Sequence, residues 1–144
     1  MGTWIEALEL AVKAHGSQVD KVGDPYILHP MRVSMRIGKT SGFDHPVAIV
    51  GLLHDVLEDT AVDVWDLWSA GYSVEIINAL EALTHKEGEE YSDYILRVRE
   101  NKLAVVVKLA DIFDNLDPNR LEKLDPETAS RLVAKYGMAL GMLN

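Results

Sequence analysis

One stretch, residues 46–60, constrains this chain more than any other, because it is strongly apolar and yet carries four ionisable side chains. The longest apolar run in the sequence leads directly into them: His54, Asp55, Glu58 and Asp59. Residues four apart share one face of a helix, so a helix here would gather one imidazole and three carboxylates into a compact patch. Carboxylates that close together repel one another unless a cation or bound protons intervene. The pattern therefore predicts a helix that carries a metal site.

The apolar residues are spaced as in helices along nearly the whole chain. Val105–Val107 has strand propensity, but the residues after it return to helical spacing and no second strand candidate exists to pair with it. The sequence therefore predicts an all-α fold, a single compact bundle of about seven to eight helices that forms one domain over residues 1–144. The expected helices cover residues 4–16, 25–38, 46–60, 64–68, 74–83, 91–99 and 101–116, with a last one starting at Asp125.

The composition of the chain limits the classes of partner and the cellular compartment that we expect. A net charge of −9 argues against a nucleic-acid backbone as the main partner. The absence of cysteine excludes disulfides and thiolate ligands and fits a reducing compartment, so a cytoplasmic location is expected. The N-terminus lacks the basic region of a secretory signal, and no apolar run approaches the about 20 residues that span a bilayer. We therefore expect no membrane partner; the sequence leaves the oligomeric state open.

Two more polar side chains lie on apolar stretches. His29 alone would more often be a hydrogen-bonded core histidine, and Asp111, with Asn115 four residues further on, could cap or pair structurally. Together with His54 and Asp55, however, His29 and Asp111 make a set of two imidazoles and two carboxylates from three expected helices. Mixed nitrogen and oxygen ligands without sulfur suit Mn²⁺, Fe²⁺ or Zn²⁺ and leave coordination positions open for water and substrate.

In these motifs the sequence resembles the HD superfamily of metal-dependent phosphohydrolases, whose signature is H…HD…D. Within that superfamily it is similar to the hydrolase domain of RelA/SpoT-type alarmone enzymes and to their stand-alone relatives, the small alarmone hydrolases and the metazoan SpoT homologue. The matching stretches occur in the order of the family, at residues 14–18, 23–30, 52–60 and 108–115.

The resemblance implies a bound Mn²⁺, or another divalent transition metal, with four protein ligands: His29, His54, Asp55 and Asp111. It implies that Glu58 and Asp59 are the catalytic pair that positions and activates the attacking water. The reaction implied is removal of the 3′-pyrophosphate of (p)ppGpp, which releases pyrophosphate and GDP or GTP. Such a chain would be an all-α HD-domain enzyme whose partner is a small purine nucleotide.

Substrate contacts are expected from four residues. The resemblance places Lys21 and Asn115 at positions that touch nucleotide or phosphate. On the last helix, Arg131 and Tyr136 could reach back to phosphate and base, although surface charge and a core aromatic are the simpler interpretations.

Two departures from the family pattern leave the substrate open. Asp20 stands where the family commonly has Arg, which removes one cation, and Asp114 stands where the alarmone enzymes usually have His. Neither change alters a predicted metal ligand. An adenosine alarmone is as admissible as a guanosine one, and two alternatives remain: an HD phosphohydrolase acting on a nucleoside phosphate or NADPH, and a non-catalytic metal- or nucleotide-binding sensor.

Overall fold

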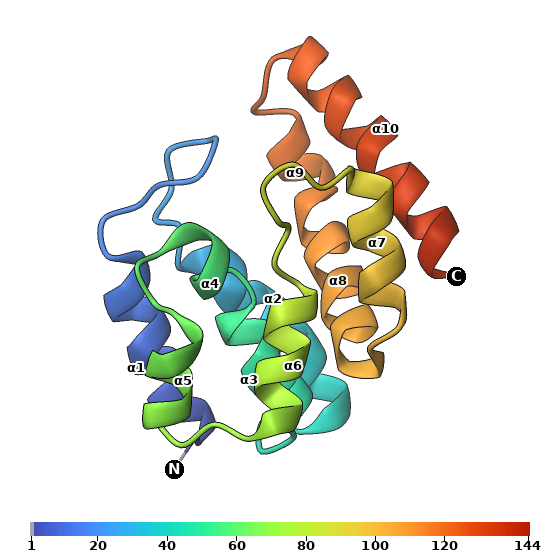
Figure 1. Ribbon diagram of the computed structural model, residues 1–144. Helices are drawn as coiled ribbons and strands as arrows, with labels where there is room; N and C mark the ends of the chain where they lie inside the picture. Colours follow the sequence, from blue (N-terminus) through green and yellow to red (C-terminus); the bar gives the residue numbers. More distant parts are fainter. Residues whose placement is uncertain (1) are drawn as a thin grey trace.

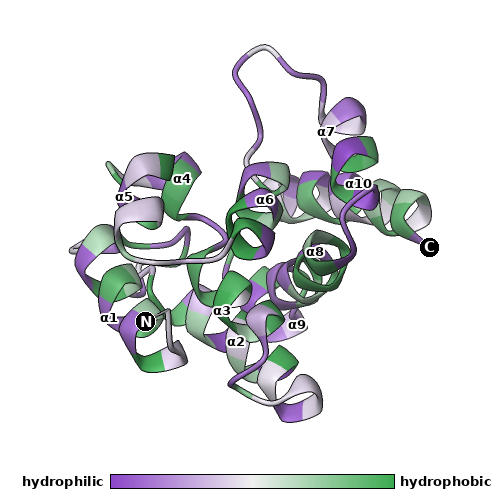
Figure 2. Ribbon diagram, turned by 60° about the horizontal axis from the view of Figure 1, so that its bottom comes forward, coloured by the Kyte–Doolittle hydropathy of each residue, from purple (hydrophilic) through white to green (hydrophobic). Residues whose placement is uncertain are grey.

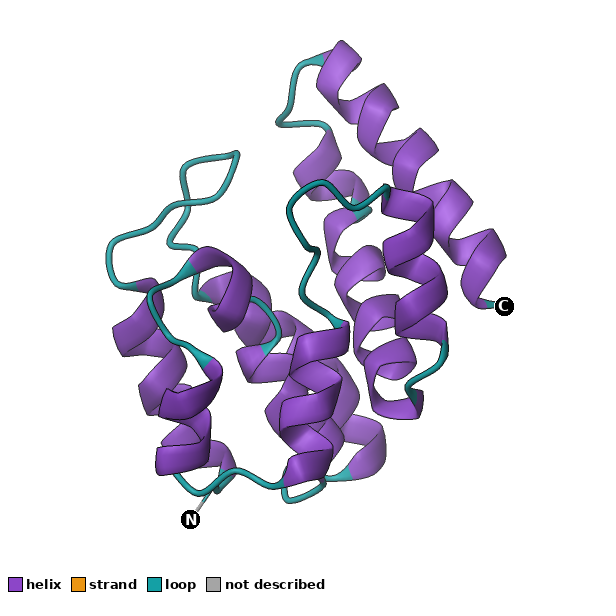
Figure 3. Ribbon diagram, in the orientation of Figure 1, coloured by secondary structure: helices purple, strands orange, loops and turns teal. Residues whose placement is uncertain are grey.

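The computed structural model describes residues 2–144, in which the regular structure is helical apart from one isolated bridge between Val19 and Pro25 (Figure 3). The helices are α1 (Trp4–His15), α2 (Leu28–Ser41), α3 (Pro46–Leu53), α4 (Val56–Asp59), α5 (Val64–Ser69), α6 (Val74–Ala82), α7 (Tyr91–Arg99), α8 (Lys102–Asn115), α9 (Pro118–Leu121) and α10 (Pro126–Leu143). The predicted all-α bundle is confirmed; the additional short elements, α4 and α9, are single turns of four residues each.

Helix ends follow local capping chemistry. Thr3 and Glu6 form a reciprocal capping box at the start of α1, which ends at Gly16 with a φ of 54°. Pro46 occupies the first turn of α3, and Asp125 caps α10 by accepting from the Thr128 backbone N–H. Such capping residues can be recognised in the sequence, and the boundaries of α1 and the start of α10 lie within a residue of those predicted.

The predicted helix over residues 46–60 is wrong as a continuous element. Regular helix stops at Leu53, and His54 and Asp55 form a turn before α4 begins at Val56. Nδ1 of His54 donates a hydrogen bond to the Gly51 carbonyl at 2.7 Å. This carbonyl is one of those at the end of α3 that have no partner within the helix. Asp55, with φ −104° and ψ −2°, lies close to the sparsely populated bridge region that active-site residues often occupy.

The predicted start of the second helix at Pro25 and its end at Gly38 are also wrong. Pro25 is held in extended backbone by its bridge to Val19, so α2 starts three residues later. At the other end, the helix continues past Gly38 to Ser41, and the Gly42 N–H closes it on the Gly38 carbonyl.

Helix α3 is the centre of the molecule, with every residue from Val47 to Leu53 buried. It packs against α1, α2, α6 and α8, and Figure 2 shows the hydrophobic colours gathered on α3 and α8. Gly51 permits the close approach of α2, because a Cβ there would stand 3.2 Å from the Cα of Ser34. This close packing brings the start of α2, the end of α3 and the middle of α8 together.

The C-terminal helix covers the other side of this centre. Helix α10 packs against α7 and α8 and lies along the outer edge of the molecule (Figure 1). The loop that joins α1 to α2 rises at the opposite edge of the same view, above α4. Among residues 2–144, no helix combines the length and the hydropathy that crossing a membrane would require.

Candidate metal centre

Side chains from α2, α8 and the turn after α3 meet at one point. Nε2 of His29 lies 2.8 Å from Oδ1 of Asp111, and Nε2 of His54 lies 3.5 Å from the same oxygen. Oδ2 of Asp55 is 3.1 Å from the His54 nitrogen and 3.8 Å from the His29 nitrogen. Two ligands at about 2.1 Å from one ion stand roughly 3.0–3.5 Å apart, so these spacings fit a shared metal.

The buried Nε2 of His54 is the clearest sign that a cation belongs here. Nδ1 donates to the Gly51 carbonyl, which leaves the lone pair on Nε2, and that atom has no hydrogen-bond partner within residues 2–144. Its neighbours are two carboxylates, which in their ionised form can only accept. A lone pair facing carboxylates is unfavourable unless a proton or a metal lies between them. The donor set therefore fits a divalent ion, and His29, His54 and Asp111 form the candidate metal triad.

The pKa shifts of the candidate ligands also favour a bound cation at this point. Burial opposes a charged His54, yet the Asp55 and Asp111 carboxylates raise its pKa well above the ordinary value. Burial likewise opposes a charged Asp111, but the Lys108 ammonium and then the hydrogen bond from His29 hold the pKa of Asp111 well below its usual range. The carboxylates thus stay ionised and draw positive charge toward them. A metal supplies that charge in place of ring protons.

Glu58 and Asp59 lie on α4, one turn beyond the ligands, and border the same cavity. The Glu58 carboxylate accepts a hydrogen bond from the backbone N–H of His85 at 2.7 Å, which ties it to the loop between α6 and α7. Partial burial and then the negative charges of Asp55 and Glu58 raise the pKa of Asp59 to about 6. A carboxylate with a pKa near neutrality is suited to take up and release a proton.

The cavity beside these groups has a volume of about 440 Å³. Cationic and aromatic side chains border it: Lys21, Lys108, Arg120, Lys135, Tyr91, Tyr94 and Tyr136. Lys108 is paired, with its ammonium 2.9 Å from Oδ2 of Asp111, whereas neither Lys21 nor Lys135 forms an ion pair in the described part of the chain. Partial burial and then the Lys108 and Lys21 charges lower the pKa of Lys135. Converging ammonium groups of this kind favour an anion.

Nearly all the predicted site residues line this cavity. Besides the four ligand positions and the catalytic pair, Lys21, Asn115 and Tyr136 line it, whereas Arg131 is exposed and lies outside the lining. The Asn115 amide donates to Oδ1 of Asp111 at 3.1 Å and to the Tyr136 hydroxyl at 3.4 Å. Asn115 therefore links a metal ligand to the aromatic wall.

Sequence reasoning missed several functional residues. Lys108 had a usable signal, because a lysine three residues before Asp111 in an apolar helix shares its face. Tyr26 donates its hydroxyl to Oδ2 of Asp55 at 2.5 Å, and its place in the run before His29 gave no hint of that. The cavity position of Lys135 depends on how separate helices pack, so nothing local marks it.

Asp20, which stands where the family commonly has Arg, is paired with an arginine from another part of the chain. Oδ1 of Asp20 accepts from the backbone N–H groups of Val22 and Asp24, and Oδ2 lies 3.2 Å from the Arg120 guanidinium of α9. Both Asp20 and Arg120 border the cavity. Asp114, in contrast, is absent from the cavity lining and contacts His29, so this departure lies behind a predicted metal ligand and away from the cavity.

Comparisons with known proteins point in one direction, although no family model matches the sequence. A guanosine-3′,5′-bis(diphosphate) 3′-pyrophosphohydrolase of Aquifex aeolicus is 32% identical over 118 residues, which cover 76% of this chain and 17% of the relative. The enzyme of the same name from Borreliella burgdorferi is 30% identical over 145 residues, covering 89% of this chain and 21% of the relative. This chain spans about a fifth of the length of these curated relatives.

A solved structure shares the fold. It is described as a metazoan ortholog of SpoT that hydrolyses ppGpp and plays a role in starvation responses, and it superposes with a TM-score of 0.78 at 23% identity. The match covers 98% of this chain and 85% of that one. The resemblance indicated by the motifs is thus confirmed: this chain has an all-α fold and is homologous over most of its length to one segment of the RelA/SpoT-type alarmone enzymes.

Proposed function

We propose that this chain is a Mn²⁺-dependent hydrolase that removes the 3′-pyrophosphate from a guanosine or adenosine alarmone. One observation carries the proposal: four ligand atoms converge beside a pair of carboxylates at the edge of a cation-lined cavity. The names of the relatives supply the substrate class. The choice of Mn²⁺ follows from a mixed imidazole and carboxylate ligand set that contains no sulfur. We place the reaction in the cytoplasm, where a chain without cysteine fits.

The residues divide the chemistry between them. His29, His54, Asp55 and Asp111 would hold the ion, which when bound neutralises phosphate charge and makes a nearby water more acidic. Asp59, with its pKa of about 6, accepts the proton that this water loses, and Glu58 helps to orient it. The water oxygen bonds to the phosphorus next to the ribose, the bond from that phosphorus to O3′ breaks, and O3′ gains a proton. The products are a nucleotide with a free 3′-hydroxyl and pyrophosphate.

The remaining walls of the cavity are suited to the rest of an alarmone. Lys21 and Lys135 offer positive charge for phosphate groups in a chain whose net charge is −9. Lys135 lies 4.6 Å from the centre of the Tyr91 ring and 5.5 Å from that of Tyr136. These two rings supply flat apolar surface against which a purine can stack.

The test is to incubate the purified protein and Mn²⁺ with ppGpp, ppApp, NADPH and common nucleotides, and to identify the products. Pyrophosphate from ppGpp or ppApp supports the proposal. Orthophosphate from NADPH or a simple nucleotide would replace it with a different phosphohydrolase. Tight nucleotide binding without any product would instead favour a non-catalytic sensor, and it would contradict the catalytic roles assigned to Glu58 and Asp59.

A further inference from the structure

Asp114 is a buried carboxylate directly behind a predicted metal ligand. Its side chain is almost inaccessible, at 3% exposed, and Oδ2 lies 2.6 Å from Nδ1 of His29. An ionised carboxylate can only accept, so the ring nitrogen carries the proton and donates it. The lone pair of His29 is then on Nε2, the atom that faces Asp55 and Asp111. The hydrogen bond therefore selects the tautomer that a metal at this point requires.

Arg32 holds this carboxylate in place from the other side. Its Nε donates to Oδ1 of Asp114 at 2.8 Å and its Nη2 to Oδ2 at 3.1 Å, a two-point contact that fixes the carboxylate plane. The guanidinium sets a positive charge against a carboxylate that is almost cut off from solvent, so both oxygens of the buried Asp114 are paired. Arg32 lies three residues after His29 on α2, so ligand, carboxylate and guanidinium form one closed unit between α2 and α8.

We propose that Asp114 and Arg32 are positioning residues that fix the ring of His29 for metal binding. The inference rests on the proposed metal centre but is independent of which nucleotide is cleaved. Histidine ligands whose second nitrogen binds a carboxylate are held in orientation and made more basic, and loss of such a partner weakens metal binding by about 10- to 100-fold. Asp114 thus acts on the metal through His29, from outside the cavity.

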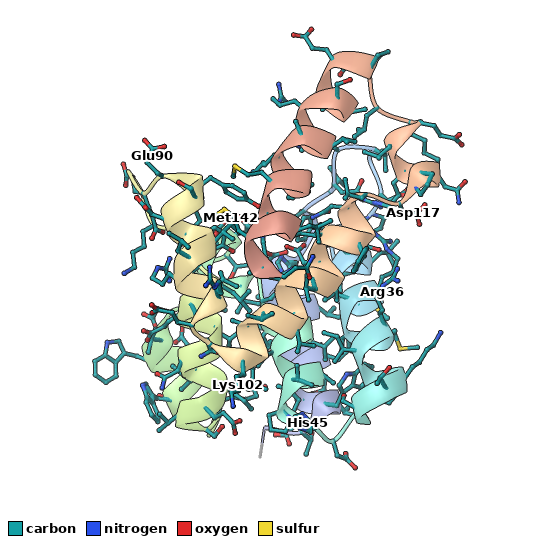
Figure 4. The ribbon with its side chains drawn as sticks, turned by 90° about the vertical axis from the view of Figure 1, so that its right-hand side faces the viewer. Arg36, His45, Glu90, Lys102, Asp117 and Met142 are labelled. Atoms are coloured by element: carbon teal, nitrogen blue, oxygen red, sulfur yellow. The ribbon has the colours of Figure 1, made fainter. Side chains whose placement is uncertain are left out.

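The surroundings of this unit provide matched controls. Arg32 reaches the surface in a second groove on the far side of α2, which Arg36 and Asp117 also border. Figure 4 shows Arg36 and Asp117 on that edge of the molecule, where α2 and the residues after α8 meet. Within residues 2–144, neither side chain forms a hydrogen bond or ion pair with His29, Arg32 or Asp114. Asp117→Asn and Arg36→Gln therefore change charge in the same groove without touching the unit.

The experiment measures Mn²⁺ affinity by titration calorimetry without nucleotide. We expect Asp114→Asn to bind Mn²⁺ about 10- to 100-fold more weakly than the wild type, and Arg32→Gln to show a smaller loss. Asp117→Asn and Arg36→Gln should match the wild type. Wild-type affinity in a folded Asp114→Asn variant would overturn the inference, and so would an equal loss in the two controls. If the wild type itself binds no Mn²⁺, the metal centre fails and this inference fails with it.

A spectroscopic measurement separates positioning from a purely structural role. In the Zn²⁺-loaded wild type, ¹⁵N NMR should show the His29 proton on Nδ1 and the metal on Nε2. In Asp114→Asn, the Nδ1 proton signal should shift, because a neutral acceptor replaces a charged one. The thermal unfolding midpoint of the metal-free variant indicates whether it is folded. Zinc bound through Nδ1, or a signal unchanged by the substitution, would contradict the proposed role.

Discussion

The two walls of the cavity are built differently. On the metal wall, His29, His54 and Asp111 are between 3% and 6% exposed and come from the closely packed α2, α3 and α8 region. On the opposite wall, Lys21 lies in a loop and Lys135 on the outer helix α10, and both are exposed. The metal wall is fixed before any ligand arrives, whereas the cationic wall has long side chains that can adjust. Under the proposed function, the first wall carries the chemistry and the second selects the substrate.

The largest effect is expected when a predicted metal ligand is removed from the metal wall, which tests whether this wall carries the chemistry. Asp55→Ala should abolish Mn²⁺ binding and lower turnover by about 1,000-fold or more, because several kcal/mol of charge stabilisation depend on the ion. Calorimetry and the product assay measure the two effects separately. Asp44→Ala, which removes an exposed carboxylate outside the cavity, should change neither. Retention of Mn²⁺ binding by Asp55→Ala would remove that residue from the ligand set.

The catalytic pair should separate metal binding from turnover. Glu58→Gln keeps the shape of the side chain but removes the negative charge that helps to orient the attacking water, so we expect turnover to fall by about 100-fold or more while Mn²⁺ affinity stays within a factor of two or three. The measurement is kcat at saturating Mn²⁺, beside a calorimetric titration of the same sample. Full activity in Glu58→Gln would exclude its assigned role.

The two walls also differ in how much of each could be predicted from the sequence. The side chains that meet at the candidate metal centre, and the two carboxylates beside them, could be picked out from the sequence as a group, because a histidine or an acid on an apolar helix is locally conspicuous, as at His54 and Asp111. The break after Leu53 was not, since it depends on the His54 ring binding a backbone carbonyl. Lys135 could not be found either, because its place at the cavity results from how α10 packs on α7 and α8. Local chemistry was thus predictable, whereas contacts between distant helices were not.

On the cationic wall, Lys135→Met should affect substrate binding more than chemistry. Loss of one phosphate-facing charge is expected to raise KM about 10-fold with kcat changed less than threefold, as a charge-assisted contact contributes about 1.5 kcal/mol. Lys123→Met is the matched control, because Lys123 is exposed and lies outside the cavity lining. An unchanged KM in Lys135→Met, or an equal rise in the control, would show that this wall does not select the substrate.

The smallest effect concerns the stability of the metal-free protein. Asp59 holds its proton up to about pH 6 when folded, against an ordinary pKa of 3.8. The folded state binds more protons between these values, so stability falls as the pH rises through that window. Asp59→Asn removes this loss and should stabilise the metal-free protein at pH 7 by on the order of 1 kcal/mol, a modest gain because solvent screens the exposed carboxyl. Urea unfolding at pH 4 and pH 7 measures it. The gain should vanish at pH 4, and a gain that is equal at both pH values would show that the cost of ionising Asp59, from desolvation and from the charges of Asp55 and Glu58, is not its cause.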